Sequence, residues 1–344
     1  MGGLRAVFIK GRGEVEVRKV PVPRIGPKEI LVKMEACGIC GTDIEKVKGE
    51  FVTPPKLGHE VAGVVAEAGR NVEGLEEGNR VFVHHHVPCY KCHYCRHGDH
   101  TMCDEFPRSN LDPCGMADYF RVPEANVERG AVLKLPEGVG FEEATLIEPL
   151  ACCIRGLNKV PIEPGDDALV VGAGPAGLMM LALLRAKGVG SLLASEVSPP
   201  RLAAAKEFGA DLAVNPLEGD LGEAVNSVTD GRGVDLAVVA VGSAKVASQT
   251  LGLVRKGGWL LLFGAPPPGD ALSYDASKLF IRELKIVPSY STTEAETNAA
   301  LKLLRLGGLK VSRLISHRFK LEEAGRAFEA AMAGGEALKV IVRP

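Results

Sequence analysis

The chain has 344 residues, of which 46% are hydrophobic and 24% charged, the composition of an ordinary globular protein. Its 41 basic and 43 acidic side chains give a formal net charge of −2, which argues against a nucleic-acid partner. No apolar run reaches the roughly 18 residues of a membrane span, and no signal-peptide core follows the N-terminus. We therefore expect a cytoplasmic protein of two domains with no membrane partner.

The N-terminal part of the chain predicts short β-strands separated by proline and glycine turns, such as Pro54-Pro55. Strand-like runs occur at residues 14–18, 30–34, 60–66, 79–83 and 119–122. Many short strands with turn signals between them indicate a small barrel-like domain.

From about Pro149 the pattern changes to strands that alternate with helices. Strands are predicted near 168–171, 191–195, 212–215, 235–241, 259–263 and 284–288, and helices include 178–187 and 201–208. Six strands in this alternation match a complete doubly wound parallel sheet, so we predict an α/β fold.

The C-terminal tail predicts a helix, a strand, a second helix and a last strand, at 293–306, 314–319, 321–332 and 338–342. Thr293 and Glu296 have the spacing of a capping box. Because the tail is too short for a core of its own, we expect it to pack on the N-terminal domain. The predicted domains are residues 1–149 with 292–344, and 150–291.

A glycine turn joins the strand at 168–171 to the helix that follows it. The turn consists of Gly172, Ala173, Gly174, Pro175, Ala176 and Gly177. Its first two glycines allow a tight turn and a close approach to a pyrophosphate, and the third allows the helix to pack on the strand. An ordinary glycine-rich turn is the alternative, but the strand, helix and following acid all stand in place for a dinucleotide.

Glu196 stands nineteen positions after Gly177, at the end of the next predicted strand. An acid at this position accepts hydrogen bonds from the adenosine ribose, and its charge opposes a 2′-phosphate. The sequence therefore predicts NAD in preference to NADP, although Arg201 nearby weakens this preference.

Four cysteines lie within fifteen residues, namely Cys89, Cys92, Cys95 and Cys103. Four thiolates in tight turns form a closed tetrahedral zinc site, so we predict a structural zinc in a lobe at about 86–106. Unligated or disulfide-bonded cysteines are the alternative. The histidines of this lobe, such as His93, are expected to be solvated.

Cys40, His59 and Glu60 form a second candidate metal site, because they stand at the ends of different predicted strands. On spacing alone, a histidine near a cysteine is more often structural than a metal ligand. Glu148 lies in an apolar run, where an unpaired carboxylate is costly and needs a cation or hydrogen-bond partner. One of the histidines at 84–86 is expected to line a pocket.

Taken together, these motifs resemble the zinc-dependent medium-chain dehydrogenases, the group of the alcohol, sorbitol and threonine dehydrogenases, over essentially the whole chain. The resemblance rests on Cys40-Gly-Thr42-Asp43, Gly58-His59-Glu60, the four-cysteine lobe, Glu148-Pro-Leu and the glycine turn with Glu196, in family order. It implies a doubly wound Rossmann sheet inserted in a mainly-β, GroES-like catalytic domain.

The resemblance also implies roles for individual residues. Cys40 and His59 would ligate a catalytic zinc, with either Glu60 or Glu148 as a further ligand. Thr42 would pass the substrate proton outward, and Glu45 stands where many relatives carry a histidine that completes the relay. Two zinc ions per chain follow, one catalytic and one structural.

On the cofactor domain, the resemblance places a second group of residues against the dinucleotide, although plain strand ends in a core fit them equally well. These residues are Ala240, Val241, Phe263, Gly264 and Ala265.

The implied activity is the reversible, NAD-linked oxidation of a secondary alcohol to a ketone. The Glu148-Pro-Leu junction looks closest to the sorbitol-type polyol dehydrogenases, and L-threonine or a simple alcohol is the alternative substrate. A non-enzymatic module that binds NAD and zinc is a rival interpretation. Homodimers or homotetramers, joined by sheet edges of the cofactor domain, are expected from the family.

Overall fold

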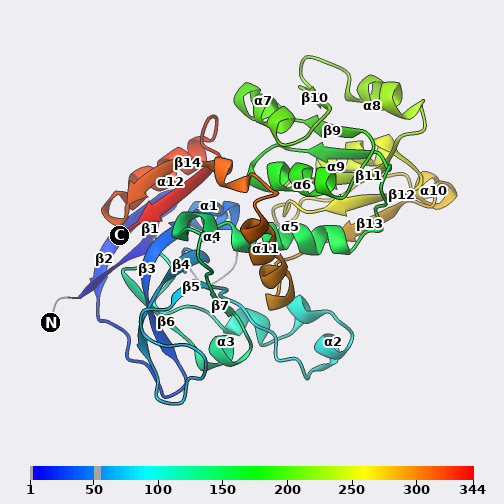
Figure 1. Cartoon of the computed structure of the whole chain (residues 1–344). Helices are drawn as coiled ribbons and strands as arrows, with labels where there is room; N and C mark the ends of the chain where they lie inside the picture. Colours follow the sequence, from blue (N-terminus) through cyan, green and yellow to red (C-terminus); the bar gives the residue numbers. More distant parts are fainter. Residues whose placement is uncertain (1–2, 50–55) are drawn as a thin grey trace. The chain divides into compact units, whose positions relative to one another are not determined.

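The computed structural model describes residues 3–49 and 56–344, so the predicted Pro54-Pro55 turn lies outside the described residues. The chain forms two compact units (Figure 1). Unit 1 comprises Met1–Ala151 and Ser291–Pro344, and unit 2 comprises Cys152–Tyr290.

Unit 1 is mainly β-structure. Its strands are β1 (Leu4–Gly11), β2 (Glu14–Val20), β3 (Ile30–Gly38), β4 (Glu60–Ala68), β5 (Arg80–Val83), β6 (Tyr119–Val122), β7 (Val132–Lys134), β14 (Ile315–Lys320) and β15 (Lys339–Arg343). Strands β1 and β2 form an antiparallel pair, and the others form a seven-stranded sheet in the order β14-β15-β3-β4-β5-β7, with β6 also paired to β3. Along β3, Ile30, Val32 and Met34 are fully buried, as expected for residues on one face of a strand.

The C-terminal tail belongs to unit 1 because its last strand extends this sheet. Strand β15 pairs antiparallel with β3, with Ile341 opposite Gly38. Phe328 and Val340 from the tail pack into the same apolar cluster as the N-terminal strands. The predicted capping box is present, since Thr293 N–H donates to Glu296 Oε2 at 3.0 Å.

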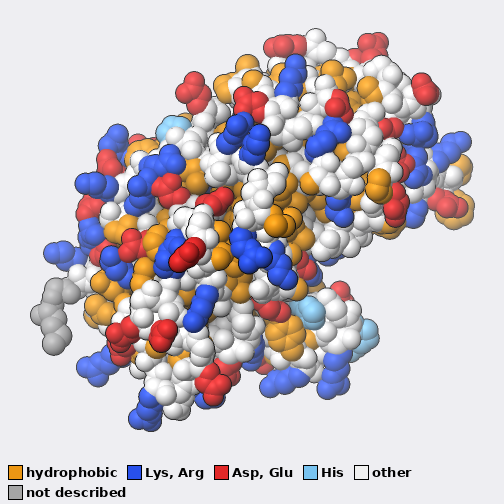
Figure 2. All heavy atoms as spheres, in the orientation of Figure 1, with side chains coloured by type: hydrophobic (Ala, Val, Ile, Leu, Met, Phe, Trp, Pro, Cys, Tyr) orange, Lys and Arg blue, Asp and Glu red, His pale blue; other side chains and the backbone are white. Residues whose placement is uncertain are grey.

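Short helices connect the strands of unit 1. They are α1 (Gly41–Lys48), α2 (His93–Arg96), α3 (Glu124–Glu128), α4 (Phe141–Ala144), α11 (Glu294–Leu306) and α12 (Ala324–Ala333), and α5 (Ile147–Asn158) continues from unit 1 into unit 2. Helix α1 ends at Gly49, whose φ of 73° is left-handed and suits glycine. On the face of the molecule that Figure 2 shows, basic and acidic side chains are interspersed.

Unit 2 is a parallel sheet flanked by helices (Figure 1). Its strands are β8 (Ala168–Val171), β9 (Leu192–Ser195), β10 (Leu212–Val214), β11 (Val234–Val239), β12 (Val254–Leu262) and β13 (Lys285–Pro288), and its helices are α6 (Pro175–Ala186), α7 (Pro199–Glu207), α8 (Leu221–Thr229), α9 (Ala244–Thr250) and α10 (Ala276–Ile281). All neighbouring strands run parallel, in the order β10-β9-β8-β11-β12-β13. This is the doubly wound order, so the predicted fold class is confirmed.

The largest differences between predicted and observed helix starts are three residues, at α6 and α12. Helix α6 begins at Pro175, three residues before the predicted start, because proline is favoured at the first helical position. Helix α12 begins at Ala324, because a 3-10 turn occupies Leu321–Glu323. No helix among the described residues is long and apolar enough to cross a membrane.

Candidate functional site

Three potential metal ligands converge in unit 1. Cys40 caps helix α1, His59 immediately precedes β4, and Glu60 is the first residue of that strand. One ligand atom from each lies within 4.8 Å of the others, and His59 and Glu60 are buried. Soft sulfur, imidazole nitrogen and carboxylate oxygen are a donor set that zinc accepts, so these residues fit the metal that the sequence predicts.

Asp43 links the two segments that carry Cys40 and His59. Its Oδ2 accepts the Cys40 N–H and its Oδ1 accepts the Gly58 N–H, both at 3.2 Å. Oδ1 also lies 3.4 Å from His59 Nδ1. Because Nδ1 faces Asp43, Nε2 is the nitrogen left for a metal, which is the usual arrangement for a ligand histidine.

The charges around His59 explain its protonation behaviour. Burial opposes a charge on the imidazole, but the interactions with Asp43 and Cys40 together outweigh burial, and the pKa of His59 is raised well above its ordinary value. Burial likewise opposes the charge of Asp43, but the interaction with His59 lowers the pKa of this carboxyl group. Each member of the pair therefore stabilises the charged form of the other.

Two further residues of α1 lie close to this cluster in sequence. Thr42 Oγ1 is 3.4 Å from His59 Nε2, on the side where a metal would lie. Glu45 follows Thr42 by three residues on the same helix, a spacing that places two side chains on one helix face.

Glu60 is held by a residue that the sequence did not reveal. Lys339, on the last strand, donates to both carboxylate oxygens of Glu60, at 2.7 Å for Oε1, and to the carbonyl oxygen of Ile39 at 3.1 Å. Both side chains of the pair are buried. Burial opposes the charge of Lys339, but the Glu60 carboxylate outweighs it and raises the pKa of the lysine.

Glu148 is placed differently from Glu60. It is 5% exposed and lies in helix α5. Its charge acts on Lys339 and contributes to the raised pKa of that lysine. Among the residues that the structure describes, the three-ligand group contains Glu60 and leaves out Glu148.

The histidines after β5 approach the same cluster. The ring centre of His85 lies 4.9 Å from that of His59 and 3.8 Å from that of His86. His84 is fully enclosed, and its ring centre is 6.4 Å from that of Phe106.

A second group of potential metal ligands lies in the lobe around α2. The sulfur atoms of its four cysteines lie within 4.8 Å of one another, namely those of Cys89, Cys92, Cys95 and Cys103. Backbone N–H groups point at the sulfurs: Cys92 N–H donates to Cys89 Sγ and Cys89 N–H donates to Cys103 Sγ, both at 3.3 Å. Hydrogen bonds from the Lys91 and Cys92 N–H groups help lower the pKa of Cys89 to about 6. A closed set of four sulfurs fits a structural zinc.

The lobe histidines stand apart from the sulfur cluster. His93 and His97 are exposed, and their ring centres lie 4.3 Å apart. Figure 2 shows histidine side chains on the surface in the region of α2.

The glycine turn of unit 2 is packed too tightly for side chains at its ends. A Cβ on Gly177 would lie 1.8 Å from the carbonyl oxygen of Gly172, and a Cβ on Gly172 would lie 2.5 Å from Val241 Cγ1. Gly174 caps helix α6 without a side-chain hydrogen bond, and Pro175 follows at the first helical position. The helix therefore starts with backbone N–H groups that can bind a pyrophosphate.

Glu196 lies at the end of β9, beside this turn. Its Oε2 accepts the Ala173 N–H at 2.8 Å, and its Oε1 accepts the N–H groups of Val197 and Ser198 at 2.9 Å. The acid thus fixes the turn. Arg201 Nη1 lies 3.9 Å from the position of a Cβ on Gly174, so it adds positive charge beside the turn.

The ends of β11 and β12 lie at the same edge of the sheet as the glycine turn. Ala240 N–H donates to the carbonyl oxygen of Val171 at 2.8 Å. Gly264 N–H donates to the carbonyl oxygen of Val239 at 2.9 Å, and a Cβ on Gly264 would lie 2.3 Å from the Val241 carbonyl carbon. Phe263 and Ala265 flank Gly264 in the segment after β12. The carboxyl edge of a doubly wound sheet is where dinucleotides bind.

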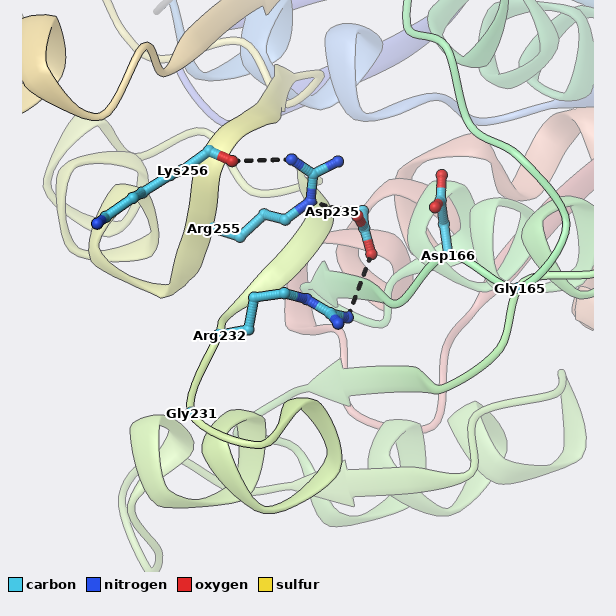
Figure 3. Close-up of a pocket in the computed structure, with 7 residues that line it drawn as sticks. All are labelled: Gly165, Asp166, Gly231, Arg232, Asp235, Arg255 and Lys256. Atoms are coloured by element: carbon cyan, nitrogen blue, oxygen red, sulfur yellow. Dashed lines mark hydrogen bonds and ion pairs between the residues drawn. The ribbon is translucent and has the colours of Figure 1, made fainter.

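The hollow shown in Figure 3 lies at the opposite edge, where these strands begin. Arg255 Nε donates to Asp235, and Arg232 donates to Asp167 at 2.7 Å. Asp235 and Asp167 also accept backbone N–H groups, those of Asp167 and Ser191 respectively. These charges are compensated within the unit, so we assign this hollow a structural role.

Comparison with known proteins places the chain in a family. Residues 26–137 match the alcohol dehydrogenase GroES-like domain, and residues 175–305 match the zinc-binding dehydrogenase domain. L-threonine 3-dehydrogenase of Pyrococcus abyssi is 37% identical over 93% of this chain and 92% of its own length. Sorbitol dehydrogenase of Bacillus subtilis is 31% identical over 99% of this chain and 97% of its own length.

The chain belongs to the zinc-containing medium-chain alcohol dehydrogenase family. It is a zinc- and NAD(P)-dependent dehydrogenase that acts on CH–OH groups, as the sequence predicted.

Solved structures agree with this assignment. The alcohol dehydrogenase of Thermus sp. ATN1 superposes with a TM-score of 0.89 at 32% identity, over 99% of each chain. A zinc-binding dehydrogenase of Sinorhizobium meliloti bound to NADP superposes with a TM-score of 0.90 at 31% identity, over the whole of each chain.

The close packing of the glycine turn leads to a first prediction. Gly177→Ala would force helix α6 away from Gly172, and we expect the affinity for NADH to fall at least about tenfold, with a stability loss of roughly 1–3 kcal/mol. NADH fluorescence titration and thermal unfolding measure both effects. Gly252→Ala is the control, because no heavy atom of the described residues lies within 4 Å of its added Cβ. Equal behaviour of the two variants would contradict the packing argument.

The buried ion pair leads to a second prediction. Lys339→Met leaves the Glu60 carboxylate buried without its cation, which should lower the free energy of unfolding by about 3–5 kcal/mol. Lys339→Met combined with Glu60→Gln should recover much of this loss, and the exposed Lys302→Met should change little. Urea unfolding of the variants measures these differences. A double variant no more stable than Lys339→Met would show that the two residues are not coupled.

Proposed function

We propose that this enzyme reversibly oxidises a secondary alcohol, with polyols as the first substrate class, to a ketone with NAD. The observation that carries the proposal is the convergence of Cys40, His59 and Glu60 beside the hydroxyl of Thr42. A metal held there supplies a Lewis acid that makes an alcohol hydroxyl more acidic, and the dinucleotide supplies the hydride acceptor.

The catalytic zinc ligands that we propose are Cys40 and His59, with a carboxylate from Glu60 or Glu148. The three-ligand cluster favours Glu60. The pairing of Glu60 with Lys339 favours Glu148 instead, because a carboxylate shared with a buried ammonium is a weaker ligand. Asp43 would hold His59 in the orientation that a ligand needs.

The proton leaves the alcohol hydroxyl through side chains of helix α1 in this proposal. Thr42 has a hydroxyl that both accepts and donates, so it can take the substrate proton and release its own. Glu45, in the position where many relatives carry a histidine, or solvent would receive that proton. The distance of 3.4 Å between Thr42 Oγ1 and His59 Nε2 supports a place for Thr42 next to the metal.

The cofactor-binding residues that we propose are those around the carboxyl edge of unit 2. They are Gly172, Gly174, Pro175, Ala176, Gly177, Glu196, Arg201, Ala240, Val241, Phe263, Gly264 and Ala265. Glu196 supports NAD because its charge opposes a 2′-phosphate. Arg201 and the NADP complex of the Sinorhizobium meliloti relative support NADP as the alternative.

The substrate class is a choice between polyols and L-threonine. Sorbitol dehydrogenase of Bacillus subtilis and D-arabinitol dehydrogenase 1 of Uromyces fabae support a polyol, at 31% and 30% identity. The threonine dehydrogenase of Pyrococcus abyssi, at 37% identity, supports threonine. Threonine would also need charged groups for its ammonium and carboxylate. We place polyols first.

We propose that the protein forms a dimer, or a tetramer built from dimers, through unit 2. Strand β13 ends the sheet order and pairs with β12 alone among the described strands. In helix α10, which precedes it, Phe280 and Ile281 are 83% and 72% exposed. A free strand edge beside exposed apolar side chains suits pairing with a second copy.

A cytoplasmic location is supported by the cysteines, because none of the nine forms a disulfide in the described chain. Fractionation of the cells that make the protein would test this location.

The proposed function predicts the behaviour of the two metal sites. The purified enzyme should contain two zinc ions per chain and reduce NAD with polyols or secondary alcohols. Cys40→Ser should lower the zinc content to one and abolish turnover while NADH binding persists, whereas Cys103→Ser should remove the other zinc and destabilise the lobe. Elemental analysis, NADH absorbance and fluorescence titration measure these outcomes. Full activity of metal-free enzyme, or of Cys40→Ser, would overturn the proposal.

Cofactor choice gives a separate prediction. Glu196→Ser removes the acid that binds the ribose, so kcat/KM for NAD should fall by roughly 10- to 100-fold and the ratio of NADP to NAD activity should rise. The matched control is Glu207→Ser, an exposed acid at the end of helix α7. A wild-type enzyme that prefers NADP would contradict the role given to Glu196.

The proposed interface is tested by changing its apolar residues. Phe280→Asp with Ile281→Asp should halve the mass seen by light scattering, because buried charges oppose association. Leu217→Asp, also exposed but beyond the opposite edge strand β10, should leave the mass unchanged. An unchanged mass in both variants would place the interface elsewhere.

A further inference from the structure

His85 lies in unit 1 beside the proposed metal ligand His59. Its side chain follows strand β5, and its ring centre is 4.9 Å from that of His59, with the two rings tilted by 40°. Only 9% of the residue is exposed. A buried imidazole in this position packs beside a proposed metal ligand.

The backbone around His85 is held firmly. Asn126 Nδ2 donates to the carbonyl oxygens of His84 and His85, at 2.9 and 3.1 Å. The neighbouring ring of His86 is fixed as well, because its Nδ1 lies 2.6 Å from the carbonyl oxygen of Ser109. His85 therefore sits on a rigid support, as groups that recognise a ligand need to.

Unlike His86, His85 has a ring nitrogen without a hydrogen-bond partner in the described part of the chain. Its Nδ1 is buried and has no hydrogen-bond partner among the residues that the structure describes. Buried polar atoms are nearly always hydrogen-bonded in folded proteins, so such an atom beside a catalytic cluster calls for a partner from outside the chain. Because the two ring centres are 4.9 Å apart, a substrate held at Cys40 and His59 would have the substituent next to its reacting carbon within reach of this ring.

The chemistry of imidazole and its surroundings selects the substituent. Nδ1 of a neutral imidazole donates or accepts a hydrogen bond depending on the tautomer, and a hydroxyl group can pair with it in either case. Lys46 of helix α1 lies within electrostatic range of His85, and its positive charge would repel a substrate ammonium. A second hydroxyl is therefore favoured over the ammonium group of an amino acid.

We propose that His85 is a specificity-determining residue that hydrogen-bonds the hydroxyl adjacent to the one being oxidised, so that vicinal diols and polyols are preferred over monoalcohols and threonine. This inference rests on the proposed function and names His85 as the side chain that determines the substrate class.

The test compares two substrates that differ by one hydroxyl, butane-2,3-diol and butan-2-ol, with L-threonine as a third. The variant His85→Phe keeps an aromatic ring and removes both nitrogens, His85→Asn keeps a donor and an acceptor, and the exposed lobe variant His93→Phe is the control. NADH formation gives kcat and KM. Calorimetry gives the dissociation constant of butane-2,3-diol from the zinc-loaded enzyme with NADH, which measures recognition without turnover.

We expect His85→Phe to lower kcat/KM for butane-2,3-diol by at least about tenfold, and to weaken its binding similarly, because the hydroxyl loses its partner. Activity with butan-2-ol should stay within about threefold of wild type, zinc content should stay at two per chain, and His85→Asn should recover part of the diol preference. The control should behave as wild type.

Several results would overturn the inference, and they differ from failure of the proposed function. Three results would each show that the ring does not recognise the adjacent hydroxyl. They are equal losses for the diol and the monoalcohol, loss of zinc in His85→Phe, and a dependence on His85 for threonine alone. A wild-type enzyme that oxidises butan-2-ol without preferring the diol contradicts the inference alone. If no alcohol is oxidised, the proposed function fails, and calorimetric binding of the diol to wild type and His85→Phe still decides the role of His85.

Discussion

The carboxylate of Asp43 holds together the two segments on which the metal chemistry depends. It accepts the backbone N–H groups of Cys40 and Gly58 and lies against His59 Nδ1, so one buried charge sets the positions of two proposed ligands. A buried carboxylate is tolerated only with such partners, because leaving water costs a charge much of its solvation energy. The same interactions that stabilise Asp43 thus orient the ligands.

A second buried charge connects this cluster to the far end of the chain. Lys339 reaches Glu60 from strand β15, which pairs with β3 and brings the C-terminus beside the proposed metal ligands. Gly38 makes room for the acid, since a Cβ there would lie 2.2 Å from Glu60 Oε2. The C-terminal strand therefore contributes to the electrostatics of the site as well as to the sheet. It also supplies a cation that competes for one candidate ligand.

In unit 2 the decisive constraint is steric. The glycine turn brings the start of helix α6 against Gly172 and the end of β11 against the same residue, and neither approach leaves space for a Cβ. Glu196 then ties the turn to the end of β9 through the Ala173 N–H. An acid predicted from the sequence only as a ribose ligand is thereby a structural support of the turn.

The sequence by itself determined the family, the two kinds of secondary-structure pattern and the motifs, because strand and helix periodicity and short ligand spacings are local properties. It placed strand 168–171 at the residues where β8 lies, and it left the third carboxylate ligand open. Only the tertiary structure brought Lys339 to Glu60, across 279 positions, and His85 to His59. No local pattern marks a lysine in a strand as the partner of a distant acid, because that contact exists only once the sheet has formed. The unpartnered nitrogen of His85 is likewise a property of packing, since burial decides which polar atoms lose water and still lack a partner.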